Sequence, residues 1–97
     1  MAIQEHKPMH PGQFIKKVYL EPFQMGAKEL AVSLQISESL MSRIINGKGG
    51  VTPVMALKLS RVVGRSPESW LLMQDQYDLW EARQGLDLSQ LSALKFA

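Results

Sequence analysis

A group of polar residues in the middle of the chain has the chemistry needed to read DNA bases. Helical spacing would place these side chains on one side of a short helix, with Met41 and Ile44 facing the opposite way. A guanidinium suits guanine O6 and N7, and a carboxylate can accept from the amino group of cytosine. The expected base contacts are Ser37, Glu38, Ser39, Ser42 and Arg43. Spacing alone fits a solvated face of an ordinary all-helical protein equally well.

Three further residues are expected to contact DNA phosphates. Lys28 lies near the expected start of the preceding helix, and Asn46 and Lys48 follow the polar helix. The loop at 47–50 is basic and rich in glycine, so its backbone N–H groups can also face a phosphate. This loop lacks the GxxxxGK[ST] spacing, so the sequence does not indicate nucleotide hydrolysis.

These residues are positioned by two short amphipathic helices predicted within residues 27–46. Ser37 is a suitable N-cap for the second helix, and Gly26 is an acceptable N-cap for the first. Ala31 leaves room for the second helix to cross the first closely. Gln35 occupies the turn, where a positive φ would cost about 1 kcal/mol in a residue other than glycine. The pattern is that of a helix-turn-helix unit.

Proline marks the start of three further helices. Pro11, Pro53 and Pro67 each follow a residue that can cap a helix, and proline is well tolerated at the first helical position. Glu21-Pro22 should end the first of these helices, because proline disfavours helical geometry in the residue before it. Its apolar stripe is expected to be Phe14, Ile15 and Val18. The prediction is therefore an all-α domain of five helices.

The ends of the chain have weaker patterns. Residues 1–9 show no hydrophobic period and are expected to form a loose N-terminal arm. The helical domain should span residues 10–85, with Gly85 ending the last helix. Leucines in the tail, residues 86–97, fit either a short helix that packs back on the domain or a frayed end.

The last helix carries an unusual aromatic stripe. Trp70, Met73, Tyr77 and Trp80 recur at i, i+3, i+7 and i+10. Trp70, nearest the rest of the domain, is expected in the core. For Tyr77, Leu79 and Trp80, a contact with a second subunit or a partner is as plausible as core packing.

Composition narrows the function classes. The 97 residues are 45% hydrophobic, enough for one modest core, and contain no cysteine. No apolar segment reaches membrane-spanning length and no signal region is evident, so a cytoplasmic protein without membrane attachment is expected. His6 and His10 are four apart, but Pro8 separates them and no third ligand is evident, so neither metal nor cofactor is predicted. No nucleophile, base and orienting group converge, which argues against an enzyme.

Charge is divided unevenly along the chain. Residues 1–65 contain nine Lys and Arg against four Asp and Glu, whereas residues 66–97 contain two against five. The basic part includes the helix-turn-helix, so a polyanion would be attracted there and the acidic end would turn away from it.

The chain resembles HigA-type antitoxins, the VapI branch of the Cro/C1 (XRE) helix-turn-helix family, over roughly residues 8–82. It departs from the usual pattern at Gly26, Ala27, Gln35 and Val54. The residues that carry the resemblance are His10-Pro11-Gly12, Leu20-Glu21-Pro22, Ile36 to Lys48, Thr52-Pro53, Met55-Ala56-Leu57, Ser66-Pro67-Glu68, Trp70-Leu71, Gln74 and Tyr77-Asp78-Leu79-Trp80.

The resemblance implies a lambda-repressor-like fold with an extended C-terminal helix. It also implies a homodimer that binds a palindromic double-stranded operator, represses its own operon and neutralises a RelE-like ribonuclease toxin, HigB, by complex formation. Two alternatives remain: a stand-alone repressor without a toxin, and a protein-binding module that uses the aromatic C-terminal helix.

Overall fold

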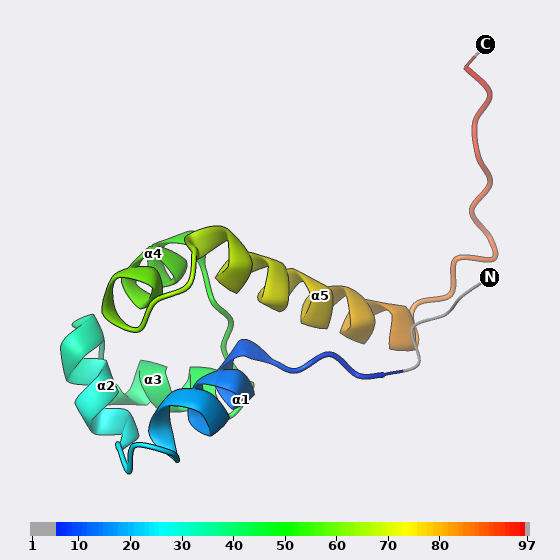
Figure 1. The fold of residues 1–97 in the computed structure, drawn as a ribbon. Coiled ribbons are helices and arrows are strands. Elements are labelled where there is room, and N and C mark those ends of the chain that lie inside the picture. The colour runs from blue at the N-terminus through cyan, green and yellow to red at the C-terminus, as the bar shows by residue number, and fades with distance from the viewer. Residues whose placement is uncertain (1–5, 97) are drawn as a thin grey trace.

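The computed structural model describes residues 6–96, and all regular secondary structure in that range is helical (Figure 1). This confirms the predicted all-α fold. None of the helices within 6–96 has the length and apolar character that crossing a membrane would require. The elements are α1 (Pro11–Ile15), a π-helical turn η1 (Lys16–Leu20) that continues it, α2 (Ala27–Leu34), α3 (Glu38–Ile45), α4 (Pro53–Val62) and α5 (Pro67–Gly85).

The helices begin where the sequence predicts. Proline occupies the first turn of α1, α4 and α5, and the preceding side chain accepts a hydrogen bond from a backbone N–H of each first turn. Ser37 caps α3 in the same way, with its Oγ 3.0 Å from the backbone nitrogen of Leu40. Gly26 caps α2, and the Glu29 carboxylate accepts from the Gly26 N–H at 3.2 Å. Each cap satisfies a donor that has no partner inside its helix.

The turn between α2 and α3 is tight and left-handed. Gln35 has φ 57° and ψ 48°, the conformation that glycine adopts most easily. The backbone nitrogen of Ile36 donates back to the carbonyl of Ala31 at 3.0 Å, which closes the turn. The expected strained position at Gln35 is therefore present.

The first helix differs from the prediction in its second half. The backbone nitrogen of Glu21 donates to the carbonyl of Lys16, five residues earlier, which defines a π-helical turn. The wider turn rotates the following side chains, so Val18 is 39% exposed and Leu20 is buried in its place. The assignment of Val18 to the apolar stripe was wrong for this reason. The helix still ends just before Pro22, as predicted.

The core lies where α1 to α4 meet the first turns of α5. Trp70 is fully buried, as expected, and its indole nitrogen donates to the carbonyl of Gly64 at 2.9 Å. Phe14 packs edge-on against Trp70 with ring centroids 5.7 Å apart. The largest fully buried side chains are Trp70, Ile15, Leu30, Leu34, Met41, Ile44, Leu59 and Pro11.

The far half of α5 and the tail leave this core. Figure 1 shows α5 extending from the other helices, with the chain beyond it running outward. Residues 86–96 contain no helix, and Leu88, Leu91 and Leu94 are exposed. Of the two expectations for the tail, the short helix that packs back on the domain is wrong. Three leucines without a neighbouring apolar surface cannot offset the cost of ordering a short helix.

α1 and α3 approach each other at Gly12. A Cβ built on Gly12 would lie 1.7 Å from the carbonyl oxygen of Ile44 and 2.8 Å from the Cα of Ile45. Real Cβ atoms do not approach backbone this closely, so only glycine fits. The contact fixes α1 against the C-terminal half of α3.

Replacing Gly12 by alanine should therefore lower the free energy of unfolding by about 3 kcal/mol, through overpacking against rigid backbone. Urea denaturation followed by circular dichroism measures this loss. Gly85→Ala is the matched control, because a Cβ there meets nothing within 4 Å, and it should be neutral or slightly stabilising. Equal stability of the two variants would contradict the close α1–α3 contact.

Candidate nucleic-acid interface

α3 presents its polar side to solvent. On its inner side Met41 and Ile44 are 0% and 1% exposed, as their spacing predicts. On its outer side Ser42 is half-buried, and the other residues expected to contact bases are exposed: Ser37, Glu38, Ser39 and Arg43. No other part of the described chain covers this side, so a ligand can reach it.

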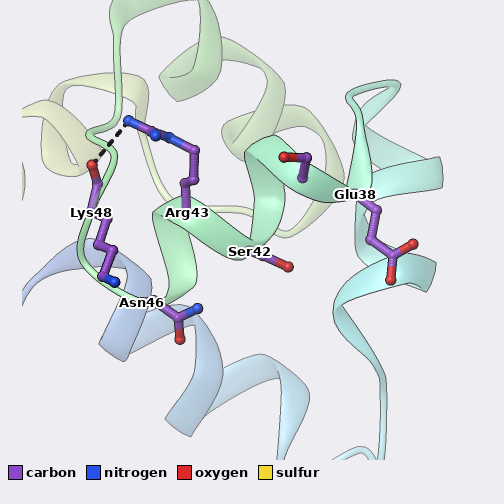
Figure 2. Close-up of a pocket in the computed structure, with 6 residues that line it drawn as sticks. Glu38, Ser42, Arg43, Asn46 and Lys48 are labelled. Atoms are coloured by element: carbon purple, nitrogen blue, oxygen red, sulfur yellow. Dashed lines mark hydrogen bonds between the residues drawn. The ribbon is translucent and has the colours of Figure 1, made fainter.

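The outer side of α3 and the loop after it form an open groove of about 450 Å³ (Figure 2). We call it the α3 groove. All of its lining residues have polar or charged side chains, which together supply one carboxylate, two hydroxyls, one amide and two cations. The residues are Glu38, Ser39, Ser42, Arg43, Asn46 and Lys48. Four expected base contacts and two expected phosphate contacts are thus brought together.

The basic end of the groove is held by the loop that follows α3. The Arg43 guanidinium donates to the carbonyl oxygen of Lys48 at 3.3 Å (Figure 2). The backbone nitrogens of Lys48 and Gly49 donate to the Arg43 carbonyl at 2.8 and 3.0 Å. A guanidinium has five N–H donors, so most remain available to a ligand. Figure 2 shows the Glu38 carboxylate at the opposite end of α3, away from these cations.

Gln74 of α5 holds the end of this loop through a hydrogen bond with its backbone. Its side chain is only 7% exposed; Oε1 accepts from the backbone nitrogen of Val51 at 2.8 Å, and Nε2 donates to Asp78 Oδ1 at 3.0 Å. A buried amide needs such partners, and here it ties α5 to the end of the loop. Sequence reasoning did not give Gln74 a role. The available signal was a polar residue four positions after Trp70, on the same inward side of α5.

His10, the N-cap of α1, is buried beside Gly47 of the loop that follows α3. Its side chain is 6% exposed, and Nδ1 accepts from the backbone nitrogen of Gly12 at 2.9 Å. The ring packs edge-on against Tyr77 with centroids 4.8 Å apart. Burial lowers the pKa of His10 below its ordinary value, although Asp78 and the backbone of Gly49 act in the opposite direction. The neutral ring is therefore the form that fits the fold.

This lowered pKa gives the stability a dependence on pH. The contribution of neutral His10 is complete above its ordinary pKa of 6.5 and is lost as the pH falls through the lower folded-state pKa. We expect the free energy of unfolding to decrease as the pH falls below about 6.5, and we expect a shallower decrease in His10→Asn, whose amide can still cap the helix. Urea titrations across this range test the point. Parallel pH curves for the two proteins would contradict it.

Lys28 does not join the α3 groove. It is exposed on α2, where it lines a separate hollow of about 360 Å³ beside Met25, Glu29 and Val32. A phosphate bound there would lie apart from one bound by Lys48. The sequence placed Lys28 near the start of α2, which is right, but the position of the groove depends on tertiary packing.

The three aromatic and apolar candidates of α5 do not form one surface. Tyr77 and Trp80 are half-buried, and the Lys7 ammonium lies 5.5 and 5.4 Å from their ring centroids. Leu79 is 52% exposed and, being two residues from Tyr77, faces another side of the helix. Lys7 thus lies beside one side of α5 and leaves Leu79 uncovered, and residues 1–5 of the predicted N-terminal arm lie outside the described residues.

The α2–α3 pair, with its buried inner side and polar outer side, defines a helix-turn-helix protein. No family model matches the chain, but individual relatives do. It is 39% identical over 84 residues to the HTH-type transcriptional regulator YddM of Escherichia coli K12, covering 87% of this chain and 88% of that protein. It is 35% identical over 83 residues to antitoxin HigA-1 of Vibrio cholerae, covering 86% and 78%.

Solved structures agree with these relatives. Antitoxin GraA superposes with a TM-score of 0.87 and 29% identity, covering 92% of this chain and 99% of GraA. GraA in complex with its operator gives a TM-score of 0.86 at 27% identity, covering 99% and 100%. PA4674 of Pseudomonas aeruginosa, in complex with operator DNA of 28 bp, gives 0.78 at 26%, covering 90% and 99%. The chain belongs to the HigA (VapI) family of helix-turn-helix antitoxins and regulators, as its motifs predict.

Proposed function

We propose that this chain is the antitoxin of a toxin–antitoxin module that binds a palindromic operator as a dimer, represses its own operon and neutralises a RelE-like toxin, HigB, by complex formation. The observation that carries the proposal is the exposed polar side of α3, held outward by Met41 and Ile44. Relatives solved with operator DNA share this fold.

In this proposal α3 enters the major groove, where donor and acceptor patterns distinguish all four base pairs. Base edges would be contacted by Ser37, Glu38, Ser39, Ser42 and Arg43. Asn46 and Lys48, at the end of α3, would contact the phosphates that border the groove, and Lys28 would contact a phosphate farther along α2. The Asn46 amide and the Lys48 ammonium suit phosphate, because they can donate to a phosphate oxygen without the fixed geometry that contact with a base edge requires.

A dimer would place two α3 helices on half-sites about one DNA turn apart. Of the three candidates Tyr77, Leu79 and Trp80 in the outer half of α5, we assign the subunit or partner contact to the side that carries Leu79, because Lys7 lies against the rings of the other two. Leu72, seven residues before Leu79, is 58% exposed, so the two leucines extend an apolar strip along one side of the helix. A symmetric contact between two α5 helices would cover this strip.

Arg43 and Lys48 should affect DNA binding differently. With the DNA upstream of the chain's own coding sequence, Arg43→Ala should lose about 1 to 3 kcal/mol of discrimination at one base pair. Lys48→Ala should weaken binding to all sequences by a similar factor, because a phosphate contact carries no sequence information. Competition binding against single-base operator variants measures both effects. Unchanged operator preference in Arg43→Ala would overturn the assignment of α3 as the recognition helix.

The dimer has a separate test. Sedimentation with and without operator duplex should show two protomers per palindromic site, and Leu79→Asp should weaken self-association, because it places a charge in the apolar contact. Gln84→Asp, which introduces the same charge at an exposed position of α5 five residues beyond Leu79 and therefore on another side of the helix, serves as the control. A protein that stays monomeric at micromolar concentration and binds DNA as a monomer would contradict the dimer.

A protein-binding module is the second candidate, and the exposed apolar tail favours it. Leu91, Leu94 and Phe96 are 73%, 76% and 89% exposed. Such residues suit contact with a partner protein, and a toxin would be one such partner. A pure protein-binding module predicts little salt-dependent affinity for duplex DNA, whereas an operator-binding antitoxin predicts affinity that falls steeply with salt. A short basic RelE-like reading frame beside this one would favour the antitoxin over a stand-alone repressor.

A further inference from the structure

A hollow of about 270 Å³, distinct from the one beside Lys28, adjoins the α3 groove, and Asn46 lines both this hollow and the groove. It lies between α1, the end of α3 and α5. Its lining includes two lysines and two side-chain amides but no carboxylate. The residues that matter for its chemistry are Lys7, His10, Gln13, Lys16, Asn46 and Tyr77.

We propose that this hollow between α1, the end of α3 and α5 binds a phosphate of the DNA backbone, with Lys16 and Gln13 of the first helix as its main ligands and Asn46 shared with the α3 groove. This inference rests on the proposed operator binding and adds the first helix to the interface. It assigns a binding role to residues outside the helix-turn-helix.

The close contact at Gly12 creates the hollow. Because α1 lies directly on Ile44 and Ile45, Gln13 is brought beside the end of α3. Lys16 follows three residues later, which places it on the same side of the helix as Gln13. Both side chains are exposed, so their donors are free to meet a ligand that already contacts Asn46.

Electrostatics in the hollow favours an anion. The Lys7 ammonium is held near the rings of Tyr77 and Trp80, which keeps a second positive charge at the rim. Asp78, the carboxylate that acts on His10, does not line the hollow, and its Oδ1 already accepts from Gln74. His10 itself is buried, and its Nδ1 is used by the helix cap.

The position points to a phosphate rather than to a base. A helix in the major groove is bordered by the sugar-phosphate backbone, so residues beyond its end meet phosphates. Gln13 and Lys16 lie beyond the end of α3, on a different element from the expected base contacts. Lysine is a compact point charge that suits a phosphate without requiring defined geometry.

The test compares Lys16→Ala with Lys17→Ala, an exposed neighbour that does not line the hollow. Affinity for the upstream duplex is measured between about 50 and 200 mM salt. Loss of one phosphate contact lowers the salt slope by about 0.9 per protomer, so wild-type affinity should fall about 3.5-fold further per protomer than that of Lys16→Ala over this range. Lys17→Ala should retain the wild-type slope.

Each outcome is decisive. A reduced slope in Lys16→Ala alone supports the site. Equal slopes in wild type and both variants overturn the site but leave operator binding intact. Equal reductions in both variants overturn the specific role of the hollow and indicate general attraction by the first helix. A wild-type chain without salt-dependent binding to the upstream duplex overturns the proposed function together with the site.

Discussion

The packing of α3 against the other helices is the constraint on which the rest of the structure depends. Met41 and Ile44 are buried beneath the helix, and Gly12 allows α1 to lie directly on the Ile44 carbonyl. With one side fixed in this way, the helix has only one side left to offer solvent, and that side is polar. The helix is just eight residues long and would not be stable alone, so tertiary packing supplies both its stability and its orientation.

The loop after α3 packs against α5 and against the N-terminus of α1. Gln74 accepts from Val51 at 2.8 Å, and His10 caps α1 while its ring contacts Tyr77. The residues proposed to meet phosphates and those proposed to meet a partner are therefore joined through two buried polar side chains on α5 and α1. Such side chains tolerate few substitutions, because loss of one partner leaves a buried donor or acceptor unpaired.

Much of the fold could be predicted from the sequence, because local signals decide helix ends. The prolines at 11, 53 and 67, the Ser37 cap and the period of the buried residues all placed their elements correctly, and Gln35 adopts the expected left-handed turn. The π-helical turn could not be predicted, because its residues, Lys16 to Leu20, include no helix breaker and the hydrogen-bond shift has no local signature. The closeness of Gly12 to Ile44, the support from Gln74 and the separation of Lys28 from the α3 groove follow from tertiary contacts. The exposed side of α3 was predictable because a short helix with two buried positions has little freedom in which side it buries.

The central claim is that the outer side of α3 is the surface that meets DNA. It is tested most directly by titrating ¹⁵N-labelled protein with the duplex upstream of its own coding sequence and following backbone amide shifts. We expect residues 37–48 to shift most and the outer half of α5 and the tail to stay nearly unchanged apart from effects of dimer formation. Large shifts confined to α5 and the tail, with 37–48 unaffected, would contradict it.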